Sequence, residues 1–132
     1  VTFVSVGTND LLQYSVAVDR MNPKLQSIYF PYNLGFLRLM KLLADEAKRA
    51  NLEVGICGEL GRNEAFLPLW IAMGYQKLSM VPGEILARRA QTANYTVEQC
   101  KDLCDLVLSC IDETEVRHRL NGFLQKDKEG RS

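Results

Sequence analysis

The chain has 132 residues, of which 47% are hydrophobic and 24% charged, and its 16 basic and 16 acidic side chains leave no formal net charge. This length suits one domain with a sizeable core, and the composition is ordinary for a globular protein. Zero net charge gives no bulk attraction to nucleic acid or to an acidic membrane. No apolar run approaches the roughly 20 residues of a membrane span, and no signal peptide is recognisable. We therefore expect neither nucleic acid nor a membrane as a partner.

The four cysteines, at positions 57, 100, 104 and 110, do not form a paired CxxC framework. Together with the remaining composition, this spacing predicts free thiols and a cytoplasmic location. Cys100 and Cys104 are spaced to share a metal ion, but no second ligand pair accompanies them and the sequence contains one histidine, His118. Packing in a helical core is therefore the favoured interpretation of these two thiols.

The first stretch of the chain predicts a strand that ends in polar residues. Residues 1–6 alternate valine or phenylalanine with small polar side chains, as a strand does, and Gly7 interrupts them. Thr8, Asn9 and Asp10 then open a helical run, where short polar side chains commonly cap the helix. The tip of a strand is also where α/β folds bind ligands, so a binding site is the alternative.

The remaining elements are expected to alternate between helix and strand before two helices close the chain. After Arg20, residues 21–33 read as a loop with a short helical turn near 25–29. The later elements are expected as a helix at 35–50 ended by Asn51, a strand at 53–57 stopped by Gly58, a helix from about Asn63 to Gly74 with Pro68 early in it, a strand at 77–80, a helix opened by Pro82, a helix behind a capping box at 96–99 and a helix from Asp112.

Helical periodicity also predicts which side chains face inward, and residues 125–132 are expected to fray. The expected inward residues are Phe36, Met40, Leu43, Ala44 and Ala47 in the first long helix, Val97, Cys100, Cys104, Val107 and Ile111 behind the capping box, and Val116, Leu120, Phe123 and Leu124 in the last helix.

Alternating strands and helices with connections of this length predict a parallel sheet with right-handed crossovers. The pattern alone suits part of a barrel or a small doubly wound sheet equally well. If the first two strands are neighbours, Cys57 lies level with Asn9 and Asp10, although a lone cysteine is more often an inert buried residue. Glu59, which follows, either orients this loop or is solvated. Arg20, beside Asp19, is by default a surface ion-pair partner.

Several short motifs together resemble a known family. They are GTNDL at 7–11, QY at 13–14, AVDR at 17–20, VGICGE at 54–59 and LSM at 78–80. The chain resembles the C-terminal phosphoenolpyruvate-binding domain of the phosphoenolpyruvate-utilising enzymes. Within that family it most resembles the phosphoenolpyruvate–protein phosphotransferases, the enzyme I class of bacterial sugar phosphotransferase systems.

This resemblance implies a fold and a set of site residues. The fold would be α/β: about the last three βα units of a (β/α)8 TIM barrel at 1–94, two C-terminal helices at 95–126 and a tail at 127–132, all part of a longer protein. Asp10 would bind Mg²⁺, Asn9 and Arg20 would contact the phosphate of phosphoenolpyruvate, and Cys57 would be the catalytic acid. The phosphorylated histidine would belong to a separate N-terminal domain, so His118 is assigned no such role.

The resemblance also implies an activity and partners, and it leaves two alternatives. The parent enzyme would transfer the phosphoryl group of phosphoenolpyruvate to its own histidine and on to a histidine phosphocarrier protein, releasing pyruvate. It would act as a homodimer, and the isolated piece would be inactive. The alternatives are an interaction module that drives dimerisation, or a piece of a pyruvate phosphate dikinase or phosphoenolpyruvate synthase.

Overall fold

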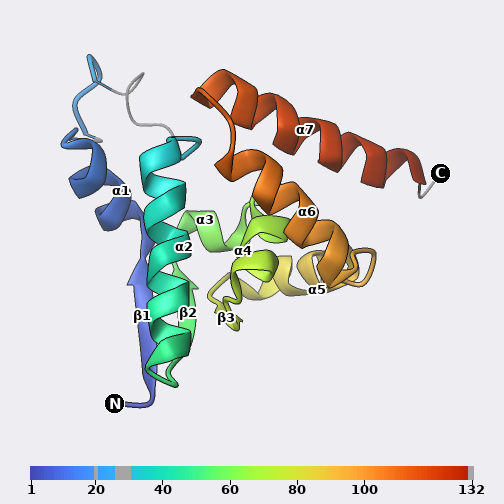
Figure 1. Ribbon diagram of the computed structural model, residues 1–132, viewed down its shortest axis with the longest axis horizontal. Coiled ribbons are helices and arrows are strands. Elements are labelled where there is room, and N and C mark those ends of the chain that lie inside the picture. Colours follow the sequence, from blue (N-terminus) through green and yellow to red (C-terminus); the bar gives the residue numbers. More distant parts are fainter. Residues whose placement is uncertain (20, 26–30, 131–132) are drawn as a thin grey trace.

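Three short strands and seven helices follow one another along the chain in the computed structural model, which describes residues 1–19, 21–25 and 31–130 (Figure 1). In chain order they are β1 (Phe3–Gly7), α1 (Thr8–Val16), α2 (Leu34–Arg49), β2 (Glu53–Cys57), α3 (Glu59–Arg62), α4 (Leu67–Met73), β3 (Lys77–Leu78), α5 (Pro82–Thr92), α6 (Val97–Leu108) and α7 (Glu113–Gly130). The helical turn expected near 25–29 falls mostly outside the described residues.

The strands form one parallel sheet in the order β1-β2-β3, which confirms the predicted parallel pairing. Because side chains alternate along a strand, Val6, Val54 and Ile56 share one face of this sheet. All three are buried in the same core cluster as side chains of α2 and α4. Helices therefore cover this face, and α2 runs alongside β1 and β2 in Figure 1.

The opposite face of the sheet presents a different chemistry. Phe3, Ser5, Glu53 and Lys77 are all exposed there. The Lys77 Nζ atom lies 2.7 Å from Glu53 Oε2 and 4.7 Å from the centroid of the Phe3 ring. The sheet thus builds its apolar core on one side and carries the exposed Phe3 ring together with charged and small polar side chains on the other.

The helix α2 has the amphipathic pattern that its sequence predicts. The Asn33 side chain accepts a hydrogen bond from the Phe36 N–H at 2.9 Å, which caps the start of the helix. Asn51 adopts a left-handed backbone with φ of 56° just beyond the end, as expected of a C-terminal signal. The buried residues of α2 are Phe36, Leu37, Met40, Ala44 and Ala47.

Aromatic side chains around α4 fill the centre of the core. Trp70 stacks on Phe66 with ring centroids 5.7 Å apart and meets Tyr75 edge-on at 5.8 Å. Their polar atoms are also satisfied, since Trp70 Nε1–H donates to the Leu60 carbonyl at 2.8 Å and the Tyr75 hydroxyl donates to the Met40 carbonyl at 2.8 Å. Burial raises the pKa of Tyr75, so its hydroxyl stays a donor.

Two expectations about the middle of the chain are corrected. The helix expected from Asn63 begins at Leu67, because the Asn63 side chain instead accepts from the Ala65 N–H at 3.0 Å in a tight turn. Pro68 then lies in the first turn of α4, where its missing N–H costs nothing. The third strand is shorter than expected, ending at Leu78, although the Ser79 N–H still donates to the Ile56 carbonyl at 2.9 Å.

The capping box at the start of α6 is confirmed, with both reciprocal hydrogen bonds between Thr96 and Gln99 present. The buried residues of α6 recur at the spacing of a helix, and they are Cys100, Leu103, Cys104 and Val107. The prediction that Val97 and Ile111 face inward was wrong, because they are 57% and 90% exposed. Val97 lies in the first turn of α6, and Ile111 lies in the bend beyond its end, where helical period no longer applies.

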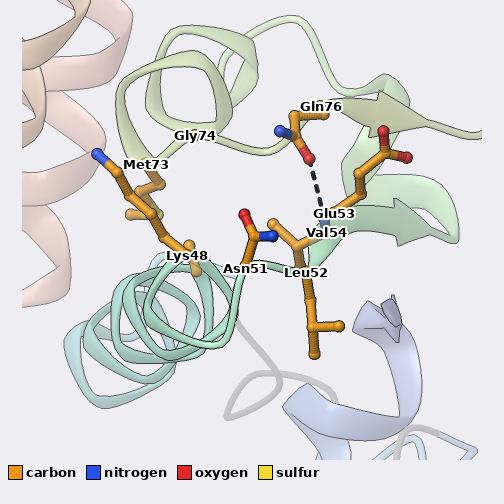
Figure 2. A pocket seen from close by; sticks show the side chains of 9 residues that line it. Lys48, Asn51, Leu52, Glu53, Val54, Met73, Gly74 and Gln76 are labelled. Atoms are coloured by element: carbon orange, nitrogen blue, oxygen red, sulfur yellow. Dashed lines mark hydrogen bonds between the residues drawn. The ribbon is translucent and has the colours of Figure 1, made fainter. Parts of the chain in front are cut away.

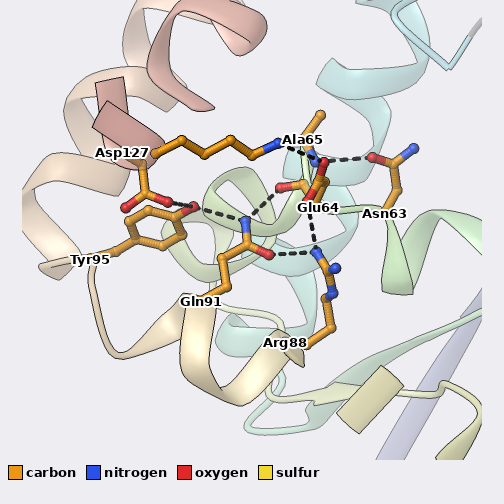
Figure 3. Close-up of polar contacts among 8 residues, drawn as sticks. Asn63, Glu64, Ala65, Arg88, Gln91, Tyr95 and Asp127 are labelled. Atoms are coloured by element: carbon orange, nitrogen blue, oxygen red, sulfur yellow. Dashed lines mark hydrogen bonds and ion pairs between the residues drawn. The ribbon is translucent and has the colours of Figure 1, made fainter. Parts of the chain in front are cut away.

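The C-terminal helix α7 extends to Gly130 instead of fraying after residue 124. A polar network attaches its end to α5 (Figure 3). The buried Gln91 amide donates to the Glu64 carbonyl at 2.9 Å and to the Tyr95 hydroxyl at 2.8 Å, and that hydroxyl donates to Asp127 at 3.3 Å. Lys128 Nζ also lies 3.4 Å from Glu64. These contacts order residues that the sequence marks as charged and solvated.

The core makes a stability prediction with a control on the same helix. Phe36→Ala removes a side chain with no exposed surface, so it should lower the free energy of unfolding by about 3–5 kcal/mol. Leu42→Ala removes a side chain that is 52% exposed and should change it by no more than about 0.5 kcal/mol. Urea denaturation followed by tryptophan fluorescence measures both values. Equal losses in the two variants would contradict this placement of α2.

Candidate functional site

The carboxyl ends of β1 and β2 meet at one rim of the sheet. Their register pairs Gly7 with Cys57, the last residue of each strand. A Cβ placed on Gly7 would lie 3.9 Å from the Cys57 sulfur, so the thiol lies over this glycine. The thiol also donates to the Val6 carbonyl at 3.6 Å and is half-buried. The expectation that Cys57 lies level with Asn9 and Asp10 required the first two strands to be neighbours. They are, and Cys57 pairs with Gly7, which directly precedes the helix that carries Asn9 and Asp10.

Thr8 connects the two strands at this rim in a way the sequence did not indicate. The N-cap of α1 is Gly7, and no side chain caps this helix. Instead the fully buried Thr8 hydroxyl donates to the Cys57 carbonyl at 3.2 Å. Leaving such a buried group without a partner costs about 1–3 kcal/mol. Thr8 is therefore a link between strands, and the capping interpretation was wrong for this residue.

Gly58 allows the start of α1 to approach the residue that follows Cys57. Its φ of 109° is a backbone conformation that favours glycine. A Cβ at this position would lie 2.9 Å from the Thr8 hydroxyl oxygen and 3.6 Å from the Asn9 amide oxygen. Asn9 is thus adjacent to the peptide that follows Cys57. An amide and a thiol from two separate motifs share one rim.

The other expected site residues are placed less tightly. Asp10 follows Asn9 in the first turn of α1, where its carboxylate is exposed. Glu59 is the first residue of α3 and is also exposed. Arg20 lies outside the described residues, while its neighbour Asp19 accepts a hydrogen bond from the Met21 N–H at 2.9 Å. The structure therefore brings Asn9 next to Gly58, the residue that follows Cys57, and Asp10 lies beside Asn9 in the first turn of α1.

The three remaining cysteines differ from Cys57 in burial. Cys100, Cys104 and Cys110 are all buried, which confirms core packing for the first two. Burial raises the pKa of Cys100 and Cys110, and raises that of Cys104 to about 11 with a smaller contribution from Asp105. In residues 1–19, 21–25 and 31–130, no three His, Cys, Asp or Glu side chains gather as a metal-binding cluster.

A hollow of about 410 Å³ lies at the other end of the sheet (Figure 2). It is bordered by Lys48 and Asn51 at the end of α2, by Met73 at the end of α4, and by Glu53 at the start of β2. In folds with parallel strands, the amino ends of the strands serve stability and the carboxyl ends carry chemistry. The rim at Cys57 is thus the better candidate site.

Comparison with known proteins identifies the family to which this chain belongs. Residues 1–97 match the family model described as the PEP-utilising enzyme, PEP-binding domain. The chain is 36% identical over 126 residues to a phosphoenolpyruvate-protein phosphotransferase of Mycoplasma genitalium, an alignment that covers 96% of this chain and 22% of the relative.

Two further relatives show the same pattern. A phosphoenolpyruvate-protein phosphotransferase of Borreliella burgdorferi is 35% identical over 122 residues, 92% of this chain and 21% of its own length. Multiphosphoryl transfer protein 1 of Escherichia coli is 35% identical over 127 residues, 96% of this chain and 15% of its own. The chain thus spans about a fifth or less of these curated relatives.

The four thiols should differ in reactivity if the rim is as described. Iodoacetamide should modify Cys57 first in the folded chain, because it is the half-buried thiol. A pKa of about 11 leaves Cys104 about 100-fold less thiolate than an ordinary thiol at the same pH, so its reaction should remain slow until the pH approaches that value. Peptide mass spectrometry measures each rate, and urea should remove the differences. Comparable rates for Cys57 and Cys104 without urea would contradict this arrangement.

Proposed function

Because the chain belongs to the PEP-binding domain family of the PEP-utilising enzymes, we propose that it supplies part of the active site of a phosphoenolpyruvate–protein phosphotransferase. The observation that carries this proposal is the pairing of Gly7 with Cys57, which brings two separate family motifs to one rim. The parent enzyme transfers the phosphoryl group of phosphoenolpyruvate to its own histidine and then to a histidine phosphocarrier protein. A dikinase or synthase fits less well, because the named relatives are phosphotransferases.

We propose that the chain forms about three βα units of a TIM barrel. Its strands are parallel and in sequential order, as they are in such a barrel. The face with Phe3, Ser5, Glu53 and Lys77 would then line the barrel interior, and the helix-covered face would point outward. The domain limits of 1–94 for these units and the helical region after residue 95 follow from the same assignment. Three strands cannot close a barrel, so the chain alone is expected to be inactive.

In the proposed reaction, the Cys57 thiol donates one proton to the product. When the bond between phosphorus and the enol oxygen of phosphoenolpyruvate breaks, the phosphoryl group forms a new bond to the histidine nitrogen. The enolate of pyruvate remains, and its C3 carbon takes the proton of the Cys57 thiol, leaving pyruvate and a thiolate. In the reverse direction the thiolate recovers that proton. The half-buried thiol at the rim suits this exchange better than the buried cysteines do.

Asn9, Asp10 and Arg20 are assigned to the anionic substrate. The Asn9 amide and the Arg20 guanidinium suit the phosphate as hydrogen-bond donors. The exposed Asp10 carboxylate suits Mg²⁺, which is commonly held by one or two carboxylates together with substrate oxygens. Bound there, the metal would offset negative charge that develops on the substrate. This is half of a site, and the rest must come from other parts of the enzyme.

Two variants separate the proton donor from the binding groups. In the whole enzyme, Cys57→Ala should lower turnover by about 10²- to 10⁴-fold, since it removes a general acid, while calorimetry shows intact phosphoenolpyruvate binding. Asp10→Asn should instead weaken the Mg²⁺-dependent part of that binding. Cys110→Ala is the control for cysteine replacement and should turn over normally. Near-normal turnover of Cys57→Ala would refute the role of this thiol.

The second candidate function is assembly into a homodimer, in the cytoplasm. One observation favours it: Val81, Ile85 and Leu86 at the start of α5 are 50%, 39% and 77% exposed. Within residues 1–19, 21–25 and 31–130, no helix combines the length and the apolarity that a membrane crossing requires. An apolar patch of this kind suits a second copy of the chain.

Sedimentation velocity over a wide concentration range tests the dimer. The sedimentation coefficient should rise with concentration for the native chain. Leu86→Glu should suppress this rise, because it introduces a charge into the patch. Ile111→Glu is the control, since Ile111 is exposed elsewhere. A native chain that remains monomeric throughout would contradict this assignment.

A further inference from the structure

Thr8 is one of two buried polar side chains in the described part of the chain, the other being Gln91. Gln91 satisfies its amide within the network that joins α5 to α7. The hydroxyl of Thr8 makes a contact of a different kind: it crosses from the start of α1 and donates to the Cys57 carbonyl at 3.2 Å. It therefore acts on the backbone of the proposed proton donor, not on its own helix.

Two constraints meet at the peptide that joins Cys57 to Gly58. On one side the Thr8 hydroxyl holds the carbonyl oxygen of this peptide. On the other side Gly58 takes a φ of 109°, and any Cβ there would lie 2.9 Å from the same hydroxyl oxygen. Because the carbonyl is held, this peptide cannot rotate freely about the Cα–C bond of Cys57, which fixes the backbone from which the Cys57 side chain projects. The thiol itself then donates to the Val6 carbonyl.

We propose that Thr8 is a positioning residue that keeps the Cys57 thiol over Gly7. This inference rests on the proposed function, in which the thiol gives its proton to the C3 carbon of the enolate. Proton transfer needs the two atoms within hydrogen-bond reach, and a shift of about 1 Å in such a group can cost about 100-fold in rate. One hydroxyl that touches neither substrate nor thiol thereby controls the geometry of the proton donor.

Two conservative variants distinguish a positioning role for Thr8 from a simple packing role, because the two roles predict opposite orders of impairment. Thr8→Val keeps the shape of the side chain and removes the hydroxyl, so it leaves the Cys57 carbonyl without this donor. Thr8→Ser keeps the hydroxyl and removes a methyl group. If Thr8 serves packing, the serine variant is the more impaired of the two. If Thr8 serves positioning, the valine variant is the more impaired, and serine rescues it.

The test uses turnover and thiol reactivity together. In the whole enzyme, Thr8→Val should lower kcat by about 10- to 100-fold with little change in the KM for phosphoenolpyruvate, and Thr8→Ser should restore kcat to within about threefold of the native value. In the 132-residue chain, Thr8→Val should change the alkylation rate of Cys57, whereas Thr8→Ser should not. Thr92→Val removes a hydroxyl that bonds within α5 and is the control for both measurements.

The outcomes separate this inference from the proposed function. Impairment by Thr8→Ser that equals or exceeds that of Thr8→Val would overturn the positioning role, as would an unchanged Cys57 alkylation rate in Thr8→Val. Full turnover in Cys57→Ala would overturn the proposed proton donor instead. In that case, a Cys57 alkylation rate that changes in Thr8→Val but not in Thr8→Ser would still support the inference that Thr8 positions the thiol.

Discussion

The parallel register that sets Gly7 opposite Cys57 determines where Cys57 lies relative to the start of α1, which carries Asn9 and Asp10. Side chains alternate between the two faces of a strand, so a shift of one residue would turn Cys57 toward the helices and bury Glu53 in the core. The register is specified by burial, because Val6, Val54 and Ile56 must share the helix-covered face. Hydrophobic packing on one side of the sheet thereby places the thiol on the other.

The segment that follows Cys57, which includes α3, is held at several points along its length. The Leu60 carbonyl accepts from Trp70, and the Glu64 carbonyl accepts from the buried Gln91, whose network also reaches the end of α7 (Figure 3). The C-terminal helices are therefore tied to the same segment that leaves the rim. Supporting contacts of this kind help a side chain at the end of a strand to keep its position.

The sequence predicted the parts of this structure that depend on local pattern. Periodicity placed α2 to within a residue at each end, and the capping box placed the start of α6. The link from Thr8 to Cys57 was not predictable, because the same residue is a good helix cap and its partner lies 49 positions away. The start of α4 at Leu67 was missed for a related reason, since Asn63 formed a turn with Ala65 where a cap was expected. When a side chain could make either of two favourable hydrogen bonds, tertiary contacts determine which of them it makes.

The account depends most on the register at the rim, and nuclear magnetic resonance of the isotopically labelled chain tests it directly. Cross-strand Overhauser contacts should connect Gly7 with Cys57 and Val6 with Ile56, as the pairing requires. Contacts that instead connect Thr8 with Cys57 along a ladder shifted by one residue, or an absence of contacts between these two strands, would contradict it.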